Sequence, residues 1–436
     1  MIRLRRCLVP VVLLAFQNLA VLAQNLPPVP SKTMPLPPVP SKMLPVPSKM
    51  MPVPPGKSLP PAVSREIPQP PTSVAPAARA RRRLAGPTMR AHFIDVGQGA
   101  CTLLEFPCGA VLVDTGGQDQ DHMDMLVQYL RAFFDTRRDL HNTLDLVIVT
   151  HPHIDHSMGL RPVAEAFKVL NYVDDGEVTG SGKANVKWIR DSVEAGERET
   201  RIRPVRDADI EALPSRKGLT DASIDPIKCD NCDPTIVVLS GGRDENPGWS
   251  ASQFKNLNNH SVVTRVDFGE SSFLFTGDLE APALQTLVAY YRKTPILDVD
   301  VYQVGHHGSD NGTTEGFLEA STPSTAVIVC GDWNFGIDGG AFTTFAYGHP
   351  RLSVIQMLSQ AIPDQRSPSI LAGVFDRARH PGALLITKQI YSTSWDATVV
   401  LEANLAGKMQ ITSTTTKPAP PTPLLVPAPA MHDSID

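Results

Sequence analysis

The stretch THPHIDHSMG, residues 150–159, contains three histidines and an aspartate within six positions. The short apolar run LDLVIVT leads into it, which is typical of a buried strand in a layered α/β protein. Layered α/β folds place ligand-binding residues at such strand ends. Imidazole and carboxylate groups suit Zn²⁺, Mn²⁺ or Fe. The spacing therefore predicts two adjacent metal centres, the first held by His151 and His153 and the second by Asp155 and His156.

Further potential ligands occur where other predicted strands end. Asp278 closes FTGD, after a glycine that permits close approach, and its carboxylate is placed to bridge two ions. The motif GHHGS contains His306 and His307, and YGHP contains His349. Because the arrangement of a strand followed by a ligand recurs, we expect these residues to share one site.

Strands alternate with helices between residues 88 and 414, which predicts one α/β domain with a mixed, layered (α+β) arrangement. The apolar spacing of residues 122–138 is helical, and residues 261–278 read as a hairpin. Residues 352–361 predict another helix, and strands close the domain. Residues 174–255 are rich in charge, glycine and proline. They are predicted to form an irregular insertion, apart from the segments VKWI and TIVVLS.

The two ends of the chain differ in composition from this domain. Arg3, Arg5 and Arg6 precede an apolar stretch, which predicts a signal peptide at 1–23. Residues 24–87 repeat motifs such as LPPVPSK and predict a proline-rich, disordered linker, and residues 415–436 predict a disordered tail. No apolar run reaches the roughly 18–20 residues that span a bilayer. We therefore expect an exported protein, periplasmic or extracellular, without a transmembrane segment in the mature chain.

Five cysteines remain after the predicted cleavage. Two of them form the motif CDNC, and a zinc ribbon would need a second such pair. Export makes disulfides possible, so we expect a local bond between Cys229 and Cys232.

The charge pattern and the missing motifs narrow the function. The formal net charge is −5, and the domain has no basic stripe with interleaved aromatic residues of the kind that binds nucleic acid. The sequence contains neither a P-loop nor a GxSxG elbow, which leaves the metal site as the candidate apparatus.

The motif HPHIDH resembles the HxHxDH signature of the metallo-β-lactamase superfamily, and VDTGG before it and FTGD after it match other superfamily motifs in the expected order. The segments around GQG, NNHS, HHGS and YGHP resemble the soluble hydrolase domain of bacterial competence DNA-uptake channel proteins and its free-standing relatives. The resemblance covers about residues 89–412, interrupted by 174–255.

The resemblance implies an αββα sandwich with a dinuclear site at one edge. His151 and His153 would hold the first metal, Asp155 and His156 the second, and Asp278 would bridge them. His306 corresponds best to the last histidine ligand, with His307 close behind, and Asp114 would orient the HxHxDH loop. The implied cofactors are two divalent ions, with Zn²⁺ expected and Mn²⁺ or Fe as alternatives.

Two departures from the family pattern stand out. A further histidine ligand is usual before the strand that leads to FTGD, whereas this chain has Asn258 and Asn259, followed by His260. An acidic residue is common after GQG, whereas this chain has Ala100. The first metal would therefore have fewer protein ligands.

Two divalent ions would activate a water molecule, and Asp155 or His349 would move the proton. The first hypothesis is an exported hydrolase of a phosphodiester, with a small molecule, nucleotide or nucleic acid as substrate. The alternatives are a lactamase- or lactonase-like hydrolase of amides or esters, and a non-catalytic, metal-stabilised binding module. The oligomeric state is not predicted.

Overall fold

The computed structural model describes residues 84–332 and 342–413. The predicted signal peptide, the linker up to residue 83 and the tail at 415–436 lie outside these residues.

The first sheet combines strands from the N-terminal half of the described chain with the two last strands of its C-terminal end. Its central strands β1, β2 and β3 are antiparallel, and β3, β5, β7 and β8 run parallel. Across the sheet the strands are β18 (Met409–Ser413), β17 (Val399–Asn404), β1 (Thr88–Phe93), β2 (Thr102–Phe106), β3 (Gly109–Val113), β5 (Leu146–Ile148), β7 (Asn171–Asp174) and β8 (Arg201–Pro204).

The second sheet begins with the antiparallel strands β9, β10 and β11, which confirms the predicted hairpin, and continues with parallel strands. Across the sheet the strands are β16 (Ile390–Ser392), β13 (Thr325–Ile328), β12 (Val301–Gln303), β11 (Ser271–Phe275), β10 (Val263–Phe268) and β9 (Thr235–Ser240). Two small sheets pair β14 (Gln365–Arg377) with β15 (His380–Lys388) and β4 (Thr143–Leu144) with β6 (Lys168–Val169).

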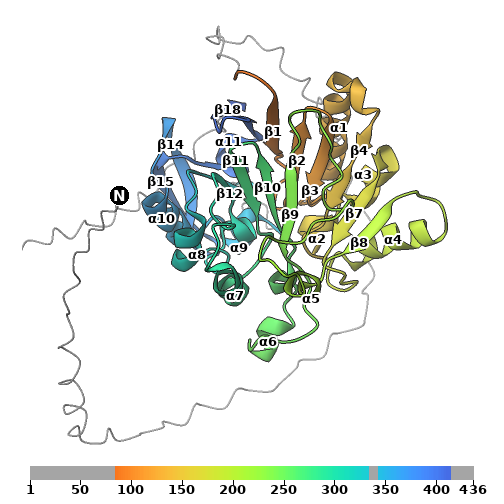
Figure 1. Cartoon of the computed structure of the whole chain (residues 1–436). Helices are drawn as coiled ribbons and strands as arrows, with labels where there is room; N and C mark the ends of the chain where they lie inside the picture. Colours follow the sequence, from red (N-terminus) through yellow and green to blue (C-terminus); the bar gives the residue numbers. More distant parts are fainter. Residues whose placement is uncertain (1–83, 333–341, 414–436) are drawn as a thin grey trace, which may run out of the picture. The chain divides into compact units, whose positions relative to one another are not determined.

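The two sheets face each other across the main core, where the rings of Phe106 on β2 and Phe268 on β10 lie 6.3 Å apart. Helices α1 (Gln120–Thr136), α3 (Leu160–Ala166) and α4 (Lys183–Glu194) pack on the outer face of the first sheet. Helices α7 (Ala281–Tyr291), α8 (Glu315–Ser321) and α10 (Leu352–Ala361) pack on the second. Figure 1 shows these layers, and they confirm the αββα expectation.

Short helices occupy the loops. They are η1 (Arg138–Leu140), α2 (Ile154–Ser157), α5 (Asp207–Glu211), α6 (Ala251–Phe254), η2 (Leu257–His260), η3 (Gly305–Gly308), α9 (Thr344–Tyr347) and α11 (Thr393–Asp396). Strands β3, β5, β11 and β12 end in loops that carry Asp114, the HxHxDH motif, Asp278 and the histidine pair, respectively.

The region 174–255 differs from the predicted irregular insertion. The segments VKWI and TIVVLS are regular as predicted, within α4 and as β9, but the region also contributes the rest of α4, β8, α5 and α6. Its high charge has a structural origin, because α4 and β8 lie at the surface and their charges pair, as in Lys187 with Asp191 and Arg203 with Asp221. Because these elements lie at the surface, their sequences have a low mean hydropathy, and the sequence pattern alone did not reveal them.

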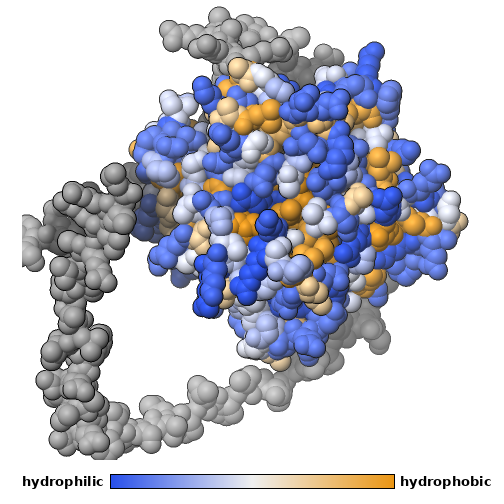
Figure 2. Space-filling model, in the orientation of Figure 1, coloured by the Kyte–Doolittle hydropathy of each residue, from blue (hydrophilic) through white to orange (hydrophobic). Residues whose placement is uncertain are grey.

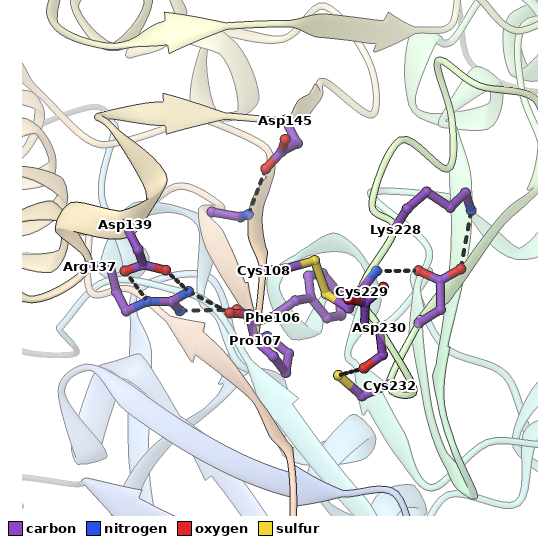
Figure 3. The surroundings of a disulfide bond; sticks show 12 residues. Phe106, Pro107, Cys108, Arg137, Asp139, Asp145, Lys228, Cys229, Asp230 and Cys232 are labelled. Carbon is purple, nitrogen blue, oxygen red and sulfur yellow. Dashed lines mark hydrogen bonds and ion pairs between the residues drawn. A yellow bond between two sulfur atoms is a disulfide. The ribbon is translucent and has the colours of Figure 1, made fainter.

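The predicted bond between Cys229 and Cys232 is wrong. Cys229 instead bonds Cys108 in the turn between β2 and β3, across a sequence separation of 121 and with 5.5 Å between the Cα atoms. Figure 3 shows this bond, with Cys232 directed to the carbonyl oxygen of Asp230 at 3.4 Å. The sheet packing brings the two distant cysteines together, which proximity in sequence does not reveal.

The outer surface is mainly polar. Figure 2 shows hydrophilic residues over most of the visible face, with hydrophobic ones scattered between them. None of the helices in the described part of the chain combines the length and apolarity that crossing a membrane requires.

Candidate metal centre

The HxHxDH motif begins in the loop after β5 and continues into α2, and backbone contacts to two neighbouring loops fix its position. The N–H of Ala100 donates to the carbonyl oxygen of Asp155 at 2.9 Å, and the N–H of Thr115 donates to that of His156 at 2.9 Å. A side chain at Gly116 would place its Cβ 1.4 Å from the Asp155 oxygen. The GQG and DTGG loops therefore support the backbone of the HxHxDH motif, and Ala100 in this contact is buried.

Asp114 orients the second half of the motif. Its backbone adopts φ 59°, which aspartate tolerates better than most residues. One carboxylate oxygen accepts from the Thr150 N–H at 2.8 Å, and the other accepts from His156 Nδ1 at 2.9 Å. In the neutral form of His156 this bond keeps the proton on Nδ1, so Nε2 is the ring atom that could bind a metal.

Four side chains converge on one point. One ligand atom from each of Asp155, His156, Asp278 and His307 lies within 4.8 Å of the other three. His156 Nε2 is 3.2 Å from Asp278 Oδ1, and His307 Nε2 is 3.5 Å from Asp155 Oδ2. His307 Nδ1 donates to the carbonyl oxygen of Val329 at 2.8 Å, so Nε2 is the unprotonated atom in the neutral form of this ring.

The donor set fits a divalent cation. His156 Nε2 and His307 Nε2 are both buried and make no hydrogen bond, and buried polar atoms in that state normally have a partner. Two bare imidazole nitrogens that face two carboxylates form the ligand set that Zn²⁺ and related ions prefer.

His151 and His153 form the neighbouring group. The hydroxyls of Thr150 and Ser261 already donate to Asp114 and to the Asn258 carbonyl oxygen, so both can only accept from His151 Nδ1. His151 Nε2 is therefore unprotonated and accepts a hydrogen bond from His153 Nδ1 at 3.0 Å. The His151 ring lies 4.2 Å from that of His156, which places the two groups side by side.

The histidine pair of η3 is ordered differently from expectation. His307, not His306, lies within the group of four. His306 Nε2 is 3.8 Å from Asp278 Oδ2 and 3.4 Å from Asn258 Nδ2, and its side chain is 19% exposed. Both residues have positive φ, 49° and 53°, which rotates the second side chain inward.

Of the residues Asn258, Asn259 and His260 in the stretch NNHS, only Asn258 lines the cavity described below. The amide of Asn258 donates to Glu280 Oε1 at 3.1 Å. Asn259 accepts from the Glu280 N–H and donates to the Gln253 carbonyl oxygen.

Both ring nitrogens of His260 make hydrogen bonds to the backbone. The N–H of Arg243 donates to Nδ1 at 3.1 Å, and Nε2 donates to the Phe254 carbonyl oxygen at 2.7 Å. Neither Asn259 nor His260 therefore presents a ligand atom to the centre.

A cavity of about 260 Å³ opens over these residues. Among the described residues that line it, none is lysine or arginine. They are Gln98, His153, Ile154, Asp155, Ser181, Asn258, Asp278, His306, His307, Phe342, Tyr347 and His349.

The charges of the centre favour bound cations. Burial alone would raise the pKa of Asp278, but the charges of His156, His307 and His306 hold that pKa well below its usual range. Burial lowers the pKa of His151 well below its usual value. Burial and the nearby His307 lower the pKa of His349 in the same way. Burial alone would lower the pKa of His156 and of His307, but Asp278 and Asp114 raise the pKa of His156, and Asp278 and Asp155 raise that of His307. The centre therefore offers ionised carboxylates, and a bound cation would displace the proton that these carboxylates favour on the two rings.

The model of the Metallo-beta-lactamase superfamily matches residues 94–332. The chain belongs to the metallo-beta-lactamase superfamily. The matched residues include both ligand groups and end before His349.

The expected resemblance to competence proteins is confirmed. "Recombination protein 2" of Haemophilus influenzae is 28% identical over 267 residues, 58% of this chain and 26% of that protein. "Competence protein ComA" of Neisseria gonorrhoeae is 35% identical over 105 residues, 24% of this chain and 13% of that protein. The chain thus spans about a quarter or less of these relatives. The metallo-beta-lactamase fold protein YhfI of Bacillus subtilis is 14% identical, with a TM-score of 0.32, and covers 56% of this chain and 85% of that one.

The structure adds site residues that the superfamily motifs did not single out. Glu280, two residues after Asp278, holds Asn258 and lies 3.9 Å from His306 Nδ1. Gln98 contacts His349, and Tyr347 and Phe342 form an aromatic rim. Gln98 belongs to the GQG segment and Glu280 to the GDLE segment. Their position next to motif residues is the feature of the sequence that could have identified them as site residues.

Replacing Gly116 with Ala is expected to push the Asp155 backbone away and to weaken metal affinity by about 10–100-fold, as loss of a supporting contact does. Metal content after dialysis measures the change. Gly316→Ala on α8 is the control, because a Cβ there meets nothing within 4 Å. An equal metal content in both variants would contradict the proposed support of the Asp155 backbone by the loop that contains Gly116.

Proposed function

We propose that the chain is an exported, metal-dependent hydrolase with a dinuclear site that acts on a phosphodiester or a related substrate. The observation that carries the proposal is the convergence of the group of four, Asp155, His156, Asp278 and His307, beside the pair His151 and His153. Superfamily membership supports a hydrolase in general.

Some residues of the centre would bind the metal ions, and another would accept the proton. Two divalent ions, Zn²⁺ or alternatively Mn²⁺ or Fe, would supply an activated water molecule and polarise the scissile group. His151, His153, His156 and His307 would hold the ions through ring nitrogens, and Asp278 would hold them through its carboxylate. Asp155 lines the cavity and is the carboxylate placed to accept a proton from the attacking group.

Two observations favour a phosphodiester over an amide or ester. The relatives carry names from recombination and competence. The described lining of the cavity contains amide and imidazole groups but no lysine or arginine, so with metal ions bound it would suit a small anionic group better than a long nucleic acid.

Export is supported by the disulfide. Bonds such as Cys108–Cys229 form and persist in oxidising compartments and are rare in the cytosol. The predicted signal peptide agrees with this placement.

The test uses the full chain, purified with its native metal. We expect turnover of bis-p-nitrophenyl phosphate and none of a chromogenic β-lactam or a lactone. Asp155→Ala should abolish that turnover, while Asp121→Ala, an exposed residue of α1, should retain it. Turnover that survives Asp155→Ala would overturn the dinuclear mechanism. Turnover of the lactam or lactone alone would reassign the substrate, and bound metal without any turnover would favour a binding module.

A further inference from the structure

Three buried side chains form a chain of hydrogen bonds in the cavity wall. The hydroxyl of Thr344 donates to Gln98 Oε1 at 2.9 Å, and Gln98 Nε2 lies 3.3 Å from His349 Nδ1. All three residues are buried. Because the amide oxygen is occupied by Thr344, the amide nitrogen faces the imidazole, and it has only hydrogens to offer. His349 Nδ1 is therefore the acceptor.

This bond decides where the proton of His349 lies. An Nδ1 atom that accepts a hydrogen bond is unprotonated, so the neutral ring carries its hydrogen on Nε2. Within the described residues Nε2 makes no hydrogen bond, and the ring lines the cavity. A neutral imidazole can donate a hydrogen bond to a substrate, but giving up its last proton would create a strongly basic anion. His349 in this state is thus unsuited to carrying a proton.

We propose that Gln98 is a positioning residue that holds His349 in the Nε2–H form, and that His349 donates a hydrogen bond to the substrate oxygen on which negative charge develops. This proposal rests on the proposed function and replaces the expected role of His349 in moving the proton. No proton leaves His349 in this step, so Asp155 remains the proton acceptor.

The loop that carries His349 is held in place before substrate arrives. The His349 N–H donates to the Thr344 carbonyl oxygen at 3.1 Å, and the Arg379 N–H, at the tip of the β14–β15 ribbon, donates to that of Phe345 at 2.9 Å. The His349 ring stacks at 6.2 Å on that of His307. A donor fixed in this way stabilises a developing charge without reorganisation.

The first test reads the tautomer directly. Nitrogen NMR of ¹⁵N-histidine-labelled full chain should show the Nε2–H form for His349, assigned by loss of its signals in His349→Ala. Thr344→Ser keeps the donating hydroxyl and should leave the form unchanged. Gln98→Glu offers Nδ1 only an acceptor and should convert the ring to a form protonated at Nδ1. An Nδ1–H signal in the native protein, or no change in Gln98→Glu, would overturn the proposal.

The second test separates a hydrogen-bond donor from a proton donor. His349→Ala should lower kcat by about 10²–10³-fold, as loss of a charge-stabilising donor does, with little change in KM. The loss should be equal across aryl phosphodiesters whose leaving groups differ in basicity. A loss that grows as the leaving group becomes more basic would show proton transfer and overturn the assignment.

The isosteric variant Thr344→Val provides a graded check on the same chain of bonds. It frees the Gln98 amide to rotate, so kcat should fall, whereas Thr344→Ser should retain it. Equal activity of the two would count against Gln98 as the positioning residue. If no phosphodiester is hydrolysed, the proposed function fails, while the NMR result still decides whether Gln98 sets the tautomer.

Discussion

Asp278→Asn is expected to remove both metals and to lower kcat/KM for a phosphodiester by at least about 10³-fold. Both carboxylate oxygens of Asp278 face ligand atoms of the group of four, with Oδ1 3.2 Å from His156 Nε2 and Oδ2 3.6 Å from His307 Nε2. Asparagine keeps the shape but loses the charge and one acceptor oxygen. Metal-ion catalysis supplies several kcal/mol of charge stabilisation, and each 1.36 kcal/mol is tenfold in rate.

Metal content by elemental analysis and kcat/KM measure this effect, with Asp267→Asn as the matched control. Asp267 lies on β10 and pairs with Arg265 outside the cavity lining. A chelator should lower the Tm of the native chain and of Asp267→Asn, because a ligand that binds only the folded state stabilises it. Asp278→Asn should show no such shift. Full metal content in Asp278→Asn would refute the bridging role.

The sequence was sufficient for the ligands that follow strands directly. The apolar run before His151 predicted a buried strand, and β5 is buried there, so the position of the motif at a strand end followed from local pattern. The order of His306 and His307 did not follow, because two successive residues with positive φ reverse the side-chain directions that alternation would give.

Contacts between segments that are distant in the chain could not be predicted from the sequence. Gln98 and His349 are 251 positions apart, and only the meeting of the two sheets brings the GQG loop to the loop after α9. The same reason explains why Cys229 bonds Cys108 and not Cys232. Local patterns describe which face of an element is apolar, but they carry no information on which loops share an edge.

Reduction or removal of the Cys108–Cys229 bond should lower the free energy of unfolding by about 4 kcal/mol. The bond closes a loop across a sequence separation of 121, and in the chain-entropy account a loop of roughly 100 residues gives about 4.7 kcal/mol. It ties the turn after β2 in the first sheet to the segment before β9 in the second, across the main core (Figure 3). Its loss should therefore loosen the packing between the two sheets.

Urea unfolding of the double variant Cys108→Ser/Cys229→Ser measures the loss, with Cys232→Ser as the control. Cys232 lies three residues from Cys229 and is equally buried, but its thiol is free, so this change should cost far less. Adding dithiothreitol should destabilise the native chain and Cys232→Ser to the level of the double variant and leave the double variant unchanged. Equal stability of all variants in oxidised buffer would contradict the bond. It would also remove the structural support for export, because an oxidising compartment is needed only if the bond forms.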